Sequence, residues 1–215
     1  MKISNIRELK KKINFFETII FDLDDTIYSQ KHYDTPALKL VSRYLSKELN
    51  INSSKIFNEL RSLKKIKRGK HPLLVFDKYL KKIKIKEKQK NKLIKKSVNL
   101  FQSYNCKNLK NVPSLKNIIK YFNKKKNLFL VTNGNISRQK RKIKYLGINS
   151  YFKKIFILDG LSKQIKPSIR DVKYLVKYLA RRSKKTAVYI GDNQKSDKAF
   201  AYNLKISFIY FEFGE

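Results

Sequence analysis

Two aspartates at the end of a short apolar run are the residues of this chain best suited to chemistry. Asp22 and Asp24 follow Ile19-Ile20-Phe21, a run typical of a buried parallel strand. Side chains alternate between the faces of a strand, so we expect the two carboxylates to point the same way, at the end where open α/β sheets bind ligands. Like charges side by side are costly unless a cation or a proton joins them. The pair therefore indicates a Mg²⁺ site with a nucleophilic carboxylate, which together can carry out phosphoryl transfer.

Three further polar segments follow later strands of the predicted fold. They are Thr132-Asn133-Gly134, Lys166-Pro167 and the run from Gly191-Asp192 to Asp197. A threonine hydroxyl and the N–H groups of a tight glycine turn are good donors to phosphate oxygens. A lysine fixed nearby can neutralise a nucleophile and a phosphoryl group together, and Asp192 with Asp197 can complete an oxygen shell for Mg²⁺ that Asp22 begins. Each segment alone fits an ordinary turn or loop, but their order on successive strand ends predicts one site.

The residues around these segments alternate between strand and helix patterns. Strands are expected at about 17–22, 127–132, 154–158, 186–190 and 206–210, and helices at about 5–16, 136–146, 168–181 and 197–202. Strands that alternate with helices form parallel sheets with right-handed crossovers. The predicted fold class is therefore α/β, with a doubly wound, Rossmann-like parallel sheet.

Residues 29–109 interrupt this alternation. Apolar residues there recur at helical spacing over 37–49, 56–63, 73–83 and 93–101, and Thr35-Pro36 and Pro72 are typical of helix starts. This pattern predicts a four-helix domain inserted into a sheet domain made of residues 1–28 and 110–215. An insertion directly after the first strand is well placed to act as a cap.

Composition narrows the class of protein. The 215 residues, 41% of them hydrophobic and 13% aromatic, describe a globular chain that can bury one good core. A single cysteine, Cys106, excludes an intrachain disulfide framework and a thiol-rich metal site. No apolar run approaches the length of a membrane span, and the basic N-terminus lacks the apolar core of a signal peptide. We therefore expect a cytoplasmic protein.

The formal net charge of +36, from 52 basic and 16 acidic residues, raises the question of nucleic-acid binding. Lysine greatly outnumbers arginine, although arginine is the better bidentate partner for bases and phosphates. The lysines are spread along the chain, which is also rich in Asn and Ile, as coding from an AT-rich genome would favour. A specific nucleic-acid partner is therefore not expected, whereas a general attraction for anionic substrates is.

The four segments, in this order, resemble the motifs of the haloacid dehalogenase superfamily. Asp22-Leu23-Asp24-Asp25-Thr26 is similar to the first motif, Thr132 to the second, Lys166 to the third, and Asp192 with Asp197 to the fourth. The resemblance covers the whole predicted sheet domain. The helical insertion after the first motif also resembles the cap found in the phosphatase branch of that superfamily.

The resemblance implies roles for the residues that carry it. Asp22 would attack phosphorus in line and form an aspartyl-phosphate. Asp24 would protonate the leaving oxygen and then take a proton from the water that hydrolyses the intermediate. Thr132 and Asn133 would hold the phosphoryl oxygens, and Lys166 would balance charge around the nucleophile and the phosphate.

A metal site also follows from the resemblance. Asp192 would ligate Mg²⁺ together with Asp22 and the backbone carbonyl of Asp24, and Asp197 would support that shell directly or through water. Asp25 has a weaker claim, because it is expected to face away from Asp24 and to cap local structure.

The acid at Asp24 decides among the reactions of the superfamily. By the same resemblance, members that dehalogenate or cleave phosphonates lack an acid two residues after the nucleophile. We therefore expect a phosphatase. A phosphomutase shares every core residue and remains an alternative, as do a non-catalytic phospho-receiver protein and a basic nucleic-acid-binding module, from other classes of protein.

The expected substrate is a small phosphate monoester: a sugar, amino-alcohol, polyol or nucleotide phosphate. Tyr28, His32 and Tyr33 lie just after the first motif and are candidates to meet the leaving group, although the tyrosines can equally be packing residues and the histidine structural. His71 has a weaker claim. A monomer or a weak homodimer is expected.

Overall fold

The computed structural model describes residues 2–3, 5–65, 74–159 and 165–213. The predicted helix start at Pro72 and the candidate His71 lie outside these residues. Two compact units make up the chain, namely Met1–Gln30 with Cys106–Glu215, and Lys31–Asn105.

The first unit is built on a parallel sheet. Its strands, among the described residues, are β1 (Lys2–Ile3), β2 (Thr18–Phe21), β3 (Asn127–Asn133), β4 (Lys154–Leu158), β5 (Ala187–Gly191) and β6 (Ser207–Phe211). They lie in the order β1-β6-β5-β2-β3-β4, and every pair is parallel. The predicted doubly wound α/β fold is confirmed. β1 was missed because a strand of two residues shows no periodicity.

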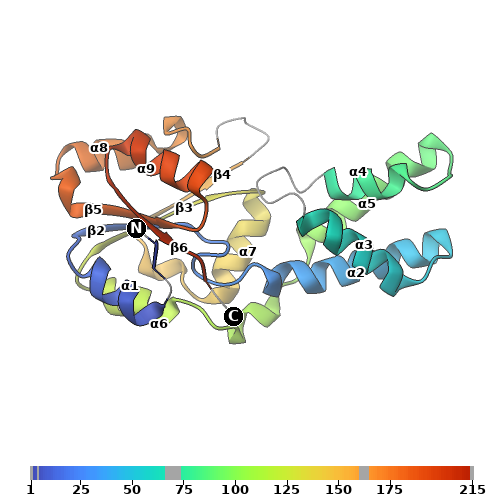
Figure 1. The fold of residues 1–215 in the computed structure, drawn as a ribbon, viewed down its shortest axis with the longest axis horizontal. Helices are drawn as coiled ribbons and strands as arrows, with labels where there is room; N and C mark the ends of the chain where they lie inside the picture. The colour runs from blue at the N-terminus through green and yellow to red at the C-terminus, as the bar shows by residue number, and fades with distance from the viewer. Residues whose placement is uncertain (1, 4, 66–73, 160–164, 214–215) are drawn as a thin grey trace. The chain divides into compact units, whose positions relative to one another are not determined.

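Helices cover both faces of this sheet. Figure 1 shows α1 (Ile6–Ile13), α6 (Lys116–Phe122) and α7 (Ile136–Leu146) on one face, and α8 (Lys173–Ala180) and α9 (Ala199–Leu204) on the other. Right-handed crossovers explain this arrangement. The connections from β2 to β3 and β4 run in one direction along the sheet, whereas those from β4 to β5 and from β5 to β6 run in the opposite direction, so their helices lie on opposite faces.

The core beneath α8 and α9 is apolar. Its buried residues come from the central strands and both helices, and include Ile20, Phe129, Val131, Tyr189, Leu175, Leu179, Phe200 and Leu204. The predicted helix at 168–181 is shorter than expected, because the turn Arg170–Val172 is a 3₁₀ helix that precedes α8. The central strands β2 and β5 are fully buried, so their packing fixes the positions of the polar residues that follow them.

The regular structure of the second unit, over its described residues, is helical. It contains α2 (Lys31–Leu49), α3 (Ser53–Lys65), α4 (Leu74–Lys81) and α5 (Glu87–Ser103), and α2 packs against both α3 and α5. α2 begins before the predicted start at Thr35-Pro36, and Pro36 lies inside it. The first turn lacks an apolar stripe, so periodicity placed the start too late. Among the described residues, we find no helix with the length and apolar character to cross a membrane.

Candidate active site

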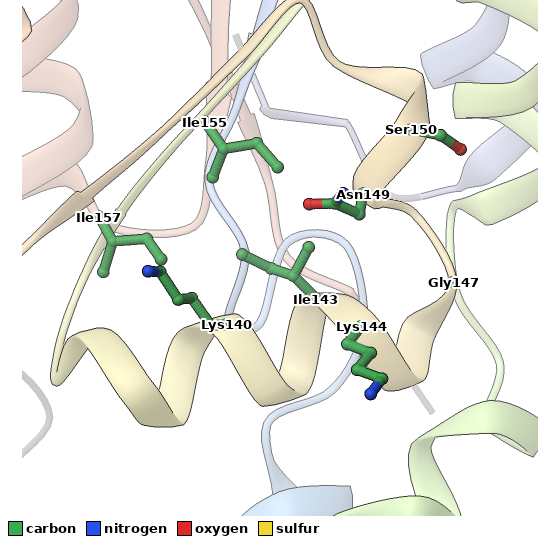
Figure 2. Close-up of a pocket in the computed structure, with 8 residues that line it drawn as sticks. All are labelled: Lys140, Ile143, Lys144, Gly147, Asn149, Ser150, Ile155 and Ile157. Carbon is green, nitrogen blue, oxygen red and sulfur yellow. The ribbon is translucent and has the colours of Figure 1, made fainter.

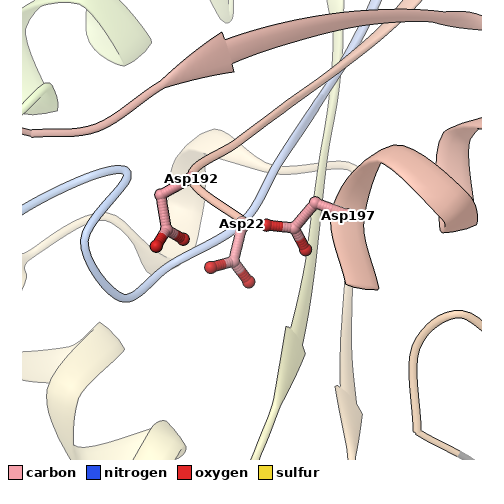
Figure 3. A group of neighbouring side chains, drawn as sticks. All are labelled: Asp22, Asp192 and Asp197. Atoms are coloured by element: carbon pink, nitrogen blue, oxygen red, sulfur yellow. The ribbon is translucent and has the colours of Figure 1, made fainter. Parts of the chain in front are cut away.

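The carboxyl ends of β2 and β5 bring three aspartates together. Phe21 pairs in register with Ile190, so Asp22 and Asp192 leave neighbouring strands at the same edge of the sheet. Asp197 lies in a π-helical turn, Gln194–Lys198, directly after β5. One carboxylate oxygen from each aspartate lies within 4.8 Å of the other two, and Figure 3 shows the three side chains next to one another.

Lys166 joins two of these carboxylates. Its buried Nζ donates to Asp22 Oδ1 at 2.6 Å, to Asp197 Oδ1 at 2.6 Å and to the Tyr189 hydroxyl at 2.9 Å. The Tyr189 hydroxyl in turn donates to the backbone carbonyl of Val131 at 3.1 Å. All three donors of the ammonium group therefore have partners. Sequence reasoning missed Tyr189, because a tyrosine within an apolar strand resembles a core residue.

The carboxylates outnumber the positive charge beside them. Burial raises the pKa of Asp22 to about 7; the charges of Asp197 and Asp24 add to this increase, and Lys166 opposes it. Burial likewise raises the pKa of Asp192 to about 8, with further increases from Asp22 and Asp197. Burial alone would lower the pKa of Lys166, but the charges of Asp197 and Asp22 hold it well above its ordinary value. The cluster therefore favours an added cation.

The carboxyl end of β3, Thr132 and Asn133, lies at the same edge, because β3 is the other neighbour of β2. The buried hydroxyl of Thr132 accepts from Gln139 Nε2 at 2.8 Å. The side-chain oxygen of Asn133 accepts from the backbone N–H of Lys166 at 3.0 Å, so it anchors the backbone at Lys166. A role for Asn133 in holding phosphoryl oxygens is thus left to its amide nitrogen and stays a prediction.

Asp24 is held by a separate set of donors. Lys142 Nζ lies 2.8 and 2.9 Å from its two oxygens, Gln139 Nε2 donates to Oδ2 at 2.9 Å, and the Tyr28 hydroxyl donates to Oδ1 at 2.8 Å. Burial by itself raises the pKa of Asp24, but Lys142 and the hydrogen bonds lower it to about 2. These partners therefore favour the ionised form of Asp24.

A sequence model of the haloacid dehalogenase-like hydrolases matches residues 16–202. The chain belongs to this family. The match includes every candidate site residue identified above, from Asp22 to Asp197. A search among curated proteins found no match.

Solved structures of other haloacid dehalogenase-like proteins share the fold. YfnB of Bacillus subtilis, described as a HAD hydrolase bound to magnesium, has a TM-score of 0.65 and 19% identity, covering 91% of this chain and 88% of that one. A HAD phosphatase of Thermococcus onnurineus has a TM-score of 0.58, 21% identity and coverage of 90% and 85%. A 2-haloacid dehalogenase of Pseudomonas syringae has a TM-score of 0.56, 18% identity and coverage of 91% and 86%. One fold thus carries different reactions, and the residues must decide among them.

The acidic cluster of this haloacid dehalogenase-like hydrolase fits a divalent cation. Asp22, Asp192 and Asp197 offer hard oxygen ligands from three rigidly placed positions, as Mg²⁺ prefers. Among the described residues, this cluster consists of Asp22, Asp192 and Asp197 and does not include the Asp24 carboxylate. Ligation of Mg²⁺ by the backbone carbonyl of Asp24, which the resemblance implies, stays a prediction.

Replacing Gly191 by Ala is expected to displace Asp197. A Cβ at position 191 would lie 2.6 Å from the Asp197 Cγ, closer than such atoms come. Asp197 is also tied to Lys166 and to the Asn193 N–H, at 2.6 and 3.0 Å, so it cannot move without losing these bonds. We expect Gly191→Ala to lower the stability by roughly 1–3 kcal/mol, seen as a lower Tm, and to weaken Mg²⁺ binding in calorimetry. Unchanged Tm and affinity would contradict this packing.

The remaining candidates near the first motif have structural contacts. Asp25, at φ +57°, accepts from the Gln30 N–H at 2.8 Å, so the expectation that it caps local structure is confirmed. Tyr33 is fully buried, and its hydroxyl donates to the carbonyl of Phe101 at 2.6 Å, so it packs within the helical unit. His32 is half-buried, and its role in substrate binding stays a prediction.

A groove of about 560 Å³ lies elsewhere, between α7 and the edge strand β4. Figure 2 shows its lining, which includes Lys140, Ile143 and Lys144 of α7 and Ile155 and Ile157 of β4. None of the candidate site residues lines it. The groove is therefore separate from the acidic cluster.

Proposed function

We propose that this hydrolase is a Mg²⁺-dependent phosphatase that hydrolyses a small phosphate monoester through an aspartyl-phosphate intermediate. The observation that carries this proposal is the position of Asp24. Gln139 Nε2 donates both to the Asp24 carboxylate and to the Thr132 hydroxyl, at 2.9 and 2.8 Å, so the second acid lies beside a donor for phosphate. An acid there can protonate an alkoxide leaving group, whereas the halide that leaves in a dehalogenation needs no proton.

In the first step, an oxygen of Asp22 attacks phosphorus and the bond from phosphorus to the leaving oxygen breaks. Asp24 delivers a proton to that oxygen. In the second step, water attacks the same phosphorus, Asp24 takes the proton of the water, and the bond to Asp22 breaks to release phosphate. An Asp24 with a pKa of about 2 is ionised, as the second role requires. For the first role it must take up a proton when substrate binds, either from solvent or from the monoanionic form of the phosphate ester.

Lys166 serves both steps by its position. Its ammonium group lies 2.6 Å from Asp22 Oδ1, so it can accompany the nucleophile and neutralise the phosphoryl oxygens that arrive there. Asp22, Asp192 and Asp197 are the residues that would hold Mg²⁺, which when bound would supply further positive charge for the phosphoryl group. Thr132 would donate its hydroxyl to a phosphoryl oxygen.

The substrate that we propose is a small phosphorylated metabolite: a sugar, amino-alcohol, polyol or nucleotide phosphate. Release of inorganic phosphate from a panel of such monoesters tests the proposal. A phosphomutase would use the same core residues but would transfer the phosphoryl group to a second hydroxyl. Isomerised substrate without phosphate release would therefore favour a mutase.

Removal of the cation is expected to silence the enzyme. With EDTA in excess, phosphate release should fall to background, because Asp22, Asp192 and Asp197 together offer more negative charge than Lys166 balances and would repel the phosphoryl group; added Mg²⁺ should restore it. The measurement is the rate of phosphate release against free Mg²⁺ concentration. Full activity in EDTA would contradict the site as proposed.

A further inference from the structure

α7 carries two fully buried polar residues that none of the four motifs includes. Gln139 and Lys142 are both 0% exposed. They are three residues apart, so they lie on the same face of the helix. A lysine is almost never fully buried without a partner, because taking its charge out of water is costly. The burial of Lys142 therefore calls for a specific reason.

That reason is the carboxylate of Asp24. Lys142 Nζ reaches both of its oxygens, at 2.8 and 2.9 Å. Gln139 Nε2 donates to Oδ2 at 2.9 Å, and the Tyr28 hydroxyl donates to Oδ1 at 2.8 Å. Each oxygen of Asp24 thus accepts two hydrogen bonds, which together select one orientation of the side chain.

The same helix connects Asp24 to the carboxyl end of β3. Gln139 Nε2 also donates to the Thr132 hydroxyl at 2.8 Å. The close approach of Gln139 depends on Gly134, because a Cβ at position 134, at φ +145°, would lie 3.2 Å from the Gln139 Cδ. The placement of Asp24 and that of Thr132 are therefore coupled through one amide group.

We propose that Gln139 and Lys142 are positioning residues that hold Asp24 in place for proton transfer to the leaving oxygen. This inference rests on the proposed phosphatase function. Proton transfer requires heavy atoms within hydrogen-bond reach, and an aspartate without partners samples three staggered rotamers about its first side-chain bond. Loss of the clamp formed by Gln139 and Lys142 leaves Asp24 in the correct orientation for a smaller share of the time.

Substrates with different leaving groups distinguish this positioning role from a purely structural one. An activated aryl phosphate such as p-nitrophenyl phosphate has a leaving group that needs little protonation, whereas an alkyl phosphate needs an acid. The value of kcat/KM covers the steps up to departure of the leaving group. The ratio of the two kcat/KM values does not depend on the fraction of folded enzyme, so a loss of stability alone leaves it unchanged.

The experiment compares Lys142→Met with the wild type on p-nitrophenyl phosphate and on the best alkyl phosphate of the panel. We expect kcat/KM for the alkyl phosphate to fall roughly 10- to 100-fold more than that for the aryl phosphate. Lys142→Arg, which keeps the charge and the donors, should restore much of the ratio. Lys144→Met, the same change at an exposed position of α7, should leave the ratio at the wild-type value.

Gln139→Met gives a second test should Lys142→Met fail to fold. It removes the amide that donates to Asp24 but leaves the buried pair of Lys142 and Asp24 intact. An equal fall on both substrates in the variant that folds, or no fall, would overturn the positioning role and leave the phosphatase proposal standing. A wild type that releases phosphate from neither ester would overturn the proposed function, and this inference with it.

Discussion

Replacing Asp22 by Asn is expected to reduce phosphate release by roughly 10⁴-fold or more, to the background of the assay. Asparagine has the shape of aspartate but not its nucleophilic oxygen, so no aspartyl-phosphate can form. The measurement is phosphate release from the best ester of the panel at saturating Mg²⁺. Asp171→Asn, the same change at an exposed position, is the matched control and should retain full activity.

The Tm of Asp22→Asn shows whether a loss of activity is due to unfolding. In the absence of Mg²⁺, the buried Asp22 carboxylate has its pKa raised to about 7, first by burial and then by Asp197 and Asp24. Removal of one of several crowded acids should therefore leave the metal-free Tm unchanged or slightly higher. A dead enzyme with an intact Tm assigns Asp22 to the chemistry, as nucleophile or as Mg²⁺ ligand, and not to the stability of the fold. A variant that keeps a tenth of the wild-type activity would show that another group attacks phosphorus.

Chemical trapping distinguishes a phosphatase from a mutase once Asp22 is established. Acid-quenched wild-type enzyme should carry phosphate on Asp22 during turnover, and the Asn variant should carry none. If the intermediate decays in water at the rate of phosphate release, the enzyme is a phosphatase. If it is stable in water and decays only when a second hydroxyl substrate is added, the mutase alternative replaces the proposed function.

The central strands and their polar ends could be predicted from the sequence, because each signal is local. A run such as Asn127–Asn133 is apolar and ends in a turn, and parallel strands bring their carboxyl ends to one edge. Asp22, Thr132 and Asp192 were therefore placed together without any knowledge of side-chain contacts. The resemblance to a family then added their roles.

The partners of Asp24 could not be predicted in this way. The chain has 52 basic residues, and α7 alone carries Lys140, Lys142 and Lys144. Which of these lysines is buried depends on the rotation of the helix about its axis. That rotation follows from packing against the sheet, and no property of the lysine itself reveals it. Tyr189 was missed for a similar reason, since only tertiary contact distinguishes its hydroxyl from that of an ordinary core tyrosine.

Replacing Asp24 by Asn is expected to slow the hydrolysis of alkyl phosphates by roughly 10²- to 10⁴-fold, the usual worth of general acid–base catalysis. An amide can neither protonate the leaving oxygen nor accept a proton from water. With p-nitrophenyl phosphate, kcat/KM should fall far less, because that leaving group needs no acid. The kcat should fall for both esters, because water must still be activated to hydrolyse their common intermediate. Undiminished kcat/KM for the alkyl ester would exclude Asp24 as the acid.

The stability of Asp24→Asn should behave unlike that of Asp22→Asn. Lys142 is fully buried against Asp24, so the substitution removes the negative charge that faces its buried ammonium group. Breaking one half of such a pair typically costs about 3–5 kcal/mol, and the oxygen that asparagine keeps should reduce this cost. The Tm should therefore fall.

The double variant Asp24→Asn/Lys142→Met separates stability from chemistry. Removal of both charges leaves no buried ion unpaired, so we expect the Tm to recover towards that of the wild type. The rate on alkyl phosphates should not recover, because the acid is still absent. A recovery of the rate together with the Tm would mean that Asp24 acts only through the stability of the fold. A recovered Tm with a lost rate assigns the proton transfer to Asp24 itself.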